Sequence, residues 1–213
     1  QMDHPHIVRV YDVRKLAENG ARLMYMQYVS GGTLQDAFRF VKQSEKQDQN
    51  GERFLAAIDV ALVDRGELPP QDSENRKKIS KMDWPRTVSL LGSQLAEALA
   101  FSHKQNILHR DLKPANVLIA ANGTPKLVDF NISHCSKIDG VSPAAYFGGS
   151  LAYMSPEQLE AFSPHNERLP DELDQRADIY SLGCMIYELL VGTRPFEPVP
   201  NTGDGQKMLD DLI

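Results

Sequence analysis

The stretch "ILHRDLKPANVLI", residues 107–119, places a polar segment between two apolar runs. Burial of unpaired charge is unfavourable by several kcal/mol, so charged groups crowded between apolar runs need either partners or a position at a cleft surface. The polar side chains of this segment are His109, Arg110, Asp111, Lys113 and Asn116. The sequence on either side indicates which of the two explanations applies.

The residues after this stretch predict a β-hairpin. The strand "NVLIA" at 116–120 is followed by an Asn-Gly turn at 122–123 and by "PKLVDF" at 125–130. An Asn-Gly pair between two β-prone runs is typical of a tight hairpin turn. Because paired strands bring their matching ends together, we expect the side chains of Asn116 and Asp129 to lie close to each other.

These polar groups form a set that suits phosphoryl transfer. The oxygens of Asn116 and Asp129 are ligands that Mg²⁺ accepts together with phosphate and water. Lys113 can neutralise charge on a transferred phosphoryl group, and Asp111 can orient a hydroxyl and accept its proton. Taken one at a time, the same residues have structural explanations: Asp111 could pair with Arg110, Lys113 could be solvated, and Asn116 could form a turn.

Composition restricts the class of protein and the partners. The chain has 213 residues, 41% of them hydrophobic and 24% charged, which is ordinary for a globular protein. The net charge of -6, without a basic block, argues against nucleic acid or a membrane surface as a partner of this segment. Two cysteines, Cys135 and Cys184, and the lack of a signal peptide or long apolar run favour a reducing, cytoplasmic location.

The remaining elements predict an α+β fold. A hairpin is expected at 7–29, with strands at 7–14 and 21–29 joined by "ENG", and a helix is expected behind a Thr33 cap. Residues 41–83 are dominated by polar side chains and are interpreted as a surface insertion with one short helix. Further helices are predicted at 84–104, capped by Asp83, and at 176–191, ending at Gly192.

The apolar residues of the last two helices fall at helical spacing and predict the face that each one buries. In the helix at 176–191 apolar residues occur almost all round, so we expect it to be central. The predicted core-facing residues are Val88, Leu91, Leu95 and Leu99 in the first helix, and Ile179, Leu182, Ile186 and Leu189 in the second.

"HRDLKPAN" followed by "VDF" resembles the catalytic and metal-binding loops of eukaryotic-type serine/threonine protein kinases. Three further stretches resemble kinase segments in the same order: the hinge "MQYVSGGTL" (26–34), the activation-segment end "GGSLAYMSPEQL" (148–159), and the helix and loop "RADIYSLGCMIYELLVGTRPF" (176–196). The resemblance implies a mainly helical large lobe with a remnant β-hairpin of the small lobe. It divides the chain into 1–29, the small-lobe remnant and hinge, and 30–213, a partial large lobe interrupted at 41–83.

The resemblance also implies roles for individual residues in binding ATP and Mg²⁺ and in phosphorylating serine or threonine of a protein substrate. Asp111, Lys113 and Ser150 would be catalytic, and Asn116 and Asp129 would bind the metal. Arg110 would hold a phosphorylated activation segment, with Ser142, Ser136 and Tyr146 as possible acceptors, and Asp178 would hold the backbone of the catalytic loop. The residues that would contact the nucleotide are Met26, Gln27, Val29, Thr33, Lys113, Asn116, Leu118 and Asp129.

Two departures from the kinase pattern keep an alternative open. Asn131 stands where kinases have glycine after "DF". The chain also begins after the place where kinases have a glycine-rich loop, a phosphate-binding lysine and its glutamate partner, and it ends before the arginine that usually pairs with the residue matching Glu157. We therefore expect an internal kinase fragment that is inactive by itself. The alternatives are a pseudokinase or scaffold domain, which Asn131 slightly favours, and a small-molecule phosphotransferase.

The sequence also supports predictions for three of the histidines. His109 is interpreted as a packed, hydrogen-bonded core residue, because the resemblance assigns proton transfer to Asp111. His4 and His6, in "DHPHIV", raise the possibility of a metal site. Two histidines without a third ligand are a weak signal for such a site.

Overall fold

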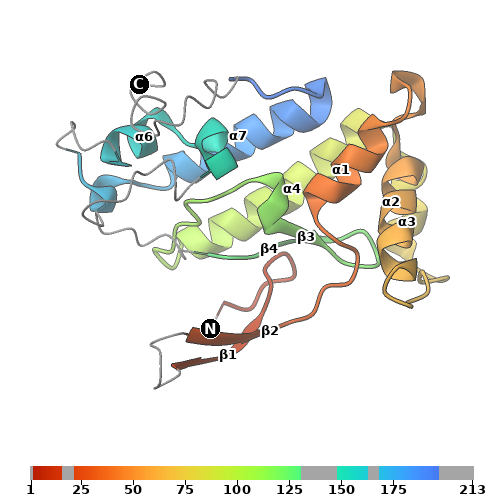
Figure 1. Cartoon of the computed structure of the whole chain (residues 1–213), viewed down its shortest axis with the longest axis horizontal. Helices are drawn as coiled ribbons and strands as arrows, with labels where there is room; N and C mark the ends of the chain where they lie inside the picture. Colours follow the sequence, from red (N-terminus) through yellow and green to blue (C-terminus); the bar gives the residue numbers. More distant parts are fainter. Residues whose placement is uncertain (1, 16–21, 131–147, 163–167, 197–213) are drawn as a thin grey trace. The chain divides into compact units, whose positions relative to one another are not determined.

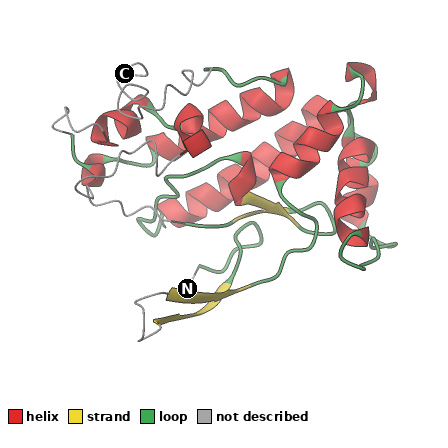
Figure 2. Ribbon diagram, viewed as in Figure 1, coloured by secondary structure: helices red, strands yellow, loops and turns green. Residues whose placement is uncertain are grey.

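The computed structural model describes residues 2–15, 22–130, 148–162 and 168–196 (Figure 1). It divides into two units, Gln1–Ser102 with Pro114–Val128, and His103–Lys113 with Asp129–Ile213, and each is described separately. The described elements are mainly helices with two small antiparallel sheets (Figure 2), which confirms the predicted α+β, kinase-like class. The division at residues 29 and 30 and around the insertion stays a prediction.

The first unit begins with the predicted N-terminal hairpin. Strands β1 (Val10–Lys15) and β2 (Arg22–Met26) pair antiparallel, with Val13 opposite Met24. The "ENG" turn lies outside the described residues. A two-stranded sheet has little core of its own, and its large apolar side chains are exposed in this structure. They are Val10, Tyr11, Val13, Leu23, Met24, Tyr25 and Met26.

The chain then enters α1 (Leu34–Lys42) through the predicted Thr33 cap. The backbone N–H of Asp36 donates to Thr33 Oγ1 at 3.1 Å, which satisfies one of the free N–H groups of the first turn. Leu34, Phe38 and Val41 are buried on the inner face of this helix. Thr33 therefore fixes the point at which the chain stops being extended and becomes helical.

The interpretation of residues 41–83 as an insertion with one short helix is wrong in its helix count. After a short 3-10 helix, η1 (Lys46–Asp48), the structure has α2 (Gly51–Val63) and α3 (Glu74–Ile79). Phe54, Ile58, Leu62 and Ile79 are fully buried. The one buried residue of α3 is Ile79. The polar composition of this helix therefore gives little indication that it packs against the rest of the unit.

The long helix α4 (Trp84–His103) and the second hairpin complete the first unit, apart from His103. Asp83 Oδ1 accepts from the N–H of Arg86 at 2.9 Å, which confirms the predicted cap, and all four apolar residues predicted for its inner face are buried. After η2 (Pro114–Asn116), β3 (Val117–Ile119) pairs antiparallel with β4 (Pro125–Leu127). The second predicted hairpin is confirmed.

The second unit contains η3 (Gly148–Tyr153), α6 (Pro156–Phe162), η4 (Pro170–Glu172) and α7 (Arg176–Val191). Helix α7 ends at Gly192, as predicted: φ is 91° there and its N–H donates to Glu188 O at 2.8 Å. Leu182 and Leu189 are buried, but Ile179 is 53% exposed, so its assignment to the core face is wrong. Among the described residues, no helix is both long enough and apolar enough to cross a membrane.

Candidate active site

The polar loop before η2 holds an ion pair. Lys113 Nζ donates to Asp111 Oδ2 at 2.8 Å, and the two side chains are 24% and 22% exposed. Leu112, between them, is buried. The loop therefore buries the apolar side chain between the two charged ones, which stay partly exposed and can meet a substrate. The structure thus brings together two of the three predicted catalytic residues.

The backbone of this loop is held by the buried carboxylate of Asp178, on the first turn of α7. Its Oδ2 accepts from the N–H of His109 at 2.9 Å, and its Oδ1 accepts from the N–H of Arg110 at 2.8 Å. Oδ2 also lies 2.7 Å from His103 Nε2. The predicted hold of Asp178 on the backbone of this loop is confirmed, and the catalytic role of the loop stays a prediction.

The pKa of Asp178 reflects the balance of these surroundings. Burial by itself would raise the pKa of the carboxyl group, because it disfavours the charged form. Hydrogen bonds from His103 and from the two backbone N–H groups stabilise the carboxylate more strongly, so the pKa is lowered from its ordinary value. Asp178 therefore holds the loop as an anion.

The backbone conformation of Arg110 and one further contact shape the loop at this residue. Its φ is 66°, in the left-handed region that non-glycine residues seldom occupy, and its carbonyl oxygen accepts from Gln158 Nε2 at 2.8 Å. The Arg110 Nε atom is buried and has no hydrogen-bond partner among the described residues. Sequence reasoning missed Gln158 and His103, because nothing local to either residue indicates a contact with a loop distant in the sequence.

His109 is the packed core histidine that was predicted. Its side chain is fully buried, and its ring centroid lies 4.7 Å from that of Phe130. Its Nδ1 lies 3.4 Å from the backbone N of Asp111, a long hydrogen bond. The histidine is therefore part of the support beneath Asp111.

The two predicted metal ligands flank the open end of the second hairpin in the sequence, Asn116 before β3 and Asp129 after β4. Asn116 is buried and its carbonyl oxygen accepts from the N–H of Val128 at 3.1 Å, so the pairing continues to the residue before Asp129. Asp129 has a φ of 64°, a strained value of the kind found at functional sites. Asn116 belongs to the first unit and Asp129 to the second, so the proximity of their side chains stays a prediction.

The predicted nucleotide-binding residues belong to the first unit. Met26 ends β2, and the N–H of Gln27 donates to Arg9 O at 2.8 Å, so this part of the chain continues the hairpin pairing. Val29 lies on the segment that leads to α1. Thr33 and Leu118 form an isolated antiparallel bridge. The structure therefore brings Thr33 and Leu118 side by side, while the adenine contacts of Met26, Gln27 and Val29 stay predictions.

Several sequence predictions fall outside the described part of the chain. Asn131, Cys135 and the possible phosphate acceptors Ser136, Ser142 and Tyr146 lie there. The side chain of Ser150, the third predicted catalytic residue, is also outside the described part.

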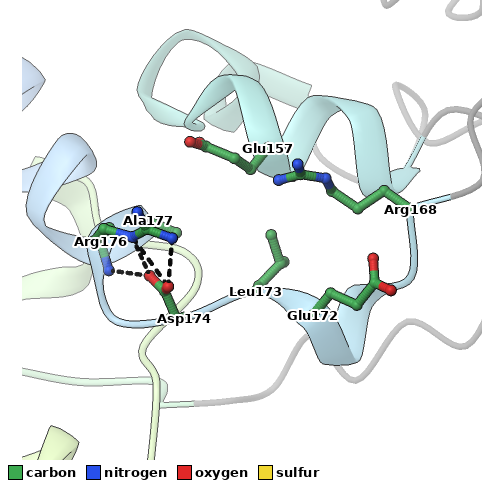
Figure 3. Close-up of a pocket in the computed structure, with 7 residues that line it drawn as sticks. All are labelled: Glu157, Arg168, Glu172, Leu173, Asp174, Arg176 and Ala177. Atoms are coloured by element: carbon green, nitrogen blue, oxygen red, sulfur yellow. Dashed lines mark hydrogen bonds and ion pairs between the residues drawn. The ribbon is translucent and has the colours of Figure 1, made fainter.

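A small pocket of the second unit contains none of the predicted site residues (Figure 3). Arg176 forms an ion pair with Asp174, in which Nη2 and Oδ2 are 2.8 Å apart. Arg168 forms another with Glu160, in which Nε and Oε2 are 3.1 Å apart. The pKa of Glu157 is lowered, first by its own backbone N–H and then by the Ser155 hydroxyl, with smaller effects from the two arginines. The pocket is lined by Glu157, Arg168, Glu172, Leu173, Asp174, Arg176 and Ala177.

The histidines near the N-terminus have structural contacts. His6 Nδ1 lies 3.0 Å from the carbonyl oxygen of Pro125 and the ring is buried, while His4 packs against Phe101. Among the described residues, no group of three or more His, Cys, Asp or Glu side chains is placed to hold a metal ion.

Comparison with known proteins identifies the family. The sequence model of the protein kinase domain matches residues 1–213. The chain is 32% identical over 198 residues to serine/threonine-protein kinase PknB of Mycobacterium leprae, covering 92% of this chain and 24% of that protein. It is 31% identical over 207 residues to PknB of Mycobacterium tuberculosis, covering 95% of this chain and 25% of that protein.

A third relative is a probable serine/threonine-protein kinase PknB of Bifidobacterium longum, 30% identical over 213 residues, with 96% of this chain and 23% of that protein covered. The chain thus spans about a quarter of the length of these relatives. The family model covers the whole chain, and the Asp111–Lys113 pair held by Asp178 occurs in the segment that resembles the kinase catalytic loop. The chain belongs to the protein kinase domain family.

Proposed function

We propose that the natural protein carrying this chain transfers the γ-phosphoryl group of ATP to serine or threonine hydroxyls of protein substrates. The observation that carries the proposal is the 2.8 Å pair between Lys113 and Asp111. A loop held by the buried Asp178 keeps this pair at the surface, where a substrate can reach it. A scaffold that performs no chemistry has no need of such an arrangement.

In the proposed reaction, the hydroxyl oxygen of the substrate attacks the γ-phosphorus as the bond to the oxygen bridging the β- and γ-phosphates breaks. The proton of the hydroxyl passes to the carboxylate of Asp111, and ADP leaves with the pair of electrons from the broken bond. The ammonium group of Lys113, already beside Asp111, would stabilise negative charge on the phosphoryl oxygens. Ser150 would add a hydroxyl between these two side chains, as the kinase resemblance implies.

The residues present fit a magnesium ion bound with a nucleotide. Mg²⁺ in such sites takes one or two protein oxygens, and its other ligands are phosphate oxygens and water. Asn116 and Asp129 would hold it through hard oxygen donors, because one precedes β3 and the other follows β4 at the open end of one hairpin. When bound, the metal ion would neutralise charge on the phosphates. The backbone of Gln27 and Val29 would bind the adenine. Met26 would lie behind the adenine, Leu118 would form the floor of its pocket, and Thr33 would lie near the ribose.

The preference for serine and threonine rests on "DLKPAN", because tyrosine kinases usually have alanine or arginine in place of a lysine such as Lys113. The relatives described above are named as serine/threonine kinases. A phosphorylated activation segment would pair with Arg110, whose buried Nε has no partner among the described residues. An ATP-dependent role and only two cysteines also favour a cytoplasmic location for this domain.

The test is transfer of label from γ-labelled ATP, with Mg²⁺, to a generic serine/threonine protein substrate by the complete natural protein. We expect label on serine or threonine and a requirement for Mg²⁺. A well-folded protein that binds the nucleotide but transfers nothing would favour the scaffold alternative. Transfer to a small molecule but not to protein would indicate the phosphotransferase alternative.

A further inference from the structure

The segment between β2 and α1 is contacted by helix α2, which belongs to the polar residues 41–83 that the kinase resemblance does not cover. Within the stretch 26–34 that resembles the kinase hinge, we use the name hinge from here on for residues 27–32, which include Gln27 and Val29. A side-chain carbon at Gly31 would lie 2.9 Å from Ile58 Cγ2 and 2.4 Å from Ile119 O, and one at Gly32 would lie 3.4 Å from Ala61 Cβ. Helix α2 is therefore packed against the hinge backbone so closely that a larger residue at Gly31 would displace one of them.

Polar contacts tie the turn after α2 to the same hinge. Arg65 Nη1 donates to Ser30 O at 2.5 Å and to Ala61 O at 3.1 Å, so one guanidinium joins the hinge to the last turns of the helix. Two residues later, Glu67 Oε1 accepts from the hydroxyl of Tyr28 at 3.1 Å. The hinge is thus bound at both Tyr28 and Ser30 by side chains from one short turn.

The turn itself has a defined conformation. Gly66 has a φ of 75°, and the N–H of Glu67 donates to Leu62 O at 3.0 Å, the pattern that ends a helix with a left-handed glycine. Leu62 is fully buried in the core of the first unit. The positions of Arg65 and Glu67 are therefore fixed by the core beneath α2 and do not depend on a free loop.

We infer that α2 and the turn 64–67 form a positioning element for the hinge, in which Arg65 is the main positioning residue. The inference rests on the proposed function, in which the backbone groups of Gln27 and Val29 bind adenine. Arg65 and Glu67 touch no nucleotide. By holding the carbonyl of Ser30 and the ring of Tyr28, they limit the conformations of the backbone that must bind it, and a preorganised site binds more tightly.

The experiment compares Arg65→Ala, Arg65→Lys and Glu67→Ala in the complete natural protein, with Lys77→Ala as control. Lys77 is an exposed cation of α3 whose side chain pairs with nearby Glu74 and with no other group among the described residues. Binding of Mg²⁺-ADP is measured by calorimetry, KM for ATP and kcat by transfer assay, and backbone hydrogen exchange in residues 27–32 by mass spectrometry. Exchange is read without nucleotide, so it does not depend on the proposed function.

For Arg65→Ala we expect nucleotide binding about three- to tenfold weaker, KM for ATP raised by a similar factor, kcat nearly unchanged, and faster exchange in the hinge. Arg65→Lys should restore most of the affinity, because an ammonium can still donate to a carbonyl, and Glu67→Ala should act in the same direction but less. If hinge exchange and nucleotide affinity in Arg65→Ala both match Lys77→Ala, the inference is wrong. If the unmodified protein binds no nucleotide, the proposed function fails, and hinge exchange still decides whether Arg65 restrains the hinge.

Discussion

At the scale of single residues, Asp178 holds the backbone at the start of the candidate site. A carboxylate has two oxygens that accept without donating, and Asp178 uses both on neighbouring N–H groups, those of His109 and Arg110. These hydrogen bonds accompany the left-handed φ of Arg110, which would otherwise be unfavourable. They therefore fix the backbone position from which Asp111 follows. A neutral side chain of similar size cannot replace it, because an amide would present a donor to one of the N–H groups.

We predict that Asp178→Ala lowers the free energy of unfolding by about 2–4 kcal/mol at neutral pH, because it leaves one buried N–H group, one partly buried N–H group and His103 without their acceptor. Urea unfolding followed by circular dichroism measures the change. Asp171→Ala, which removes an exposed carboxylate of η4, is the control and should change stability by less than about 0.5 kcal/mol. Equal effects of the two substitutions would show that the Asp178 contacts contribute nothing.

The lowered pKa of Asp178 gives this prediction a pH dependence. A carboxyl group with a folded-state pKa below the unfolded value of about 3.9 stabilises the fold above that value, where both states are ionised. As the pH falls through the folded-state pKa, the carboxylate is protonated and its contribution is lost. The stability difference between the unmodified protein and Asp178→Ala should therefore be constant above about pH 5 and shrink below pH 4. A difference that grows in acid would contradict the assigned direction.

At the scale of elements, the local sequence is sufficient to predict a helix end where one residue forms the cap. Thr33, Asp83 and Gly192 each act where the sequence predicted, because capping depends on the residue itself and its immediate neighbours. Burial was harder to predict. The apolar positions of α7 extend round the helix, so periodicity could not decide that Ile179 is exposed.

The polar composition of residues 41–83 led to the wrong prediction of one short helix there, because composition does not show which face of a helix is buried. Composition averages over all faces of a helix, whereas packing depends on one face, and α3 buries only Ile79. Charge also has a structural use here: Arg76 Nη2 lies 2.7 Å from Asp59 Oδ1, which joins α3 to α2. Contacts between residues distant in the sequence, such as Gln158 with Arg110, have no local signal at all.

We predict that Leu62→Ala in α2 destabilises the protein by about 2–4 kcal/mol, because Leu62 is fully buried and its truncation leaves a cavity. The adjacent Val63, 60% exposed, provides the control, and Val63→Ala should cost less than about 1 kcal/mol. Fluorescence of Trp84, the only tryptophan of the chain, reports the unfolding of this unit, since its ring lies 6.4 Å from that of Phe54 in α2. If both substitutions change the free energy of unfolding by the same small amount, α2 would be a surface insertion that adds little to the core.

At the scale of the whole molecule, the proposed roles are shared between the two units. The hinge, Thr33, Asn116 and Leu118 belong to the first, and Asp111, Lys113 and Asp129 belong to the second. The residues expected to contact adenine and ribose therefore belong to the first unit, whereas Lys113 and Asp129, which are also expected to contact the nucleotide, belong with Asp111 to the second. Because Asp111 is assigned proton transfer alone, its substitution should separate transfer from nucleotide binding. The division at residues 29 and 30 expected from the sequence is a different one and stays a prediction, and the support of the loop by His103 and Gln158 became visible only in three dimensions.

The most direct measurement compares Asp111→Asn with the unmodified complete protein, in phosphoryl transfer to a serine/threonine substrate and in binding of Mg²⁺-nucleotide. Asparagine keeps the size of the side chain but cannot accept the proton of the hydroxyl. We predict that kcat falls by about 10²–10⁴-fold while nucleotide affinity changes by less than about twofold. Undiminished transfer, or a loss of nucleotide affinity as large as the loss of transfer, would contradict the role of Asp111 as the base of a protein kinase.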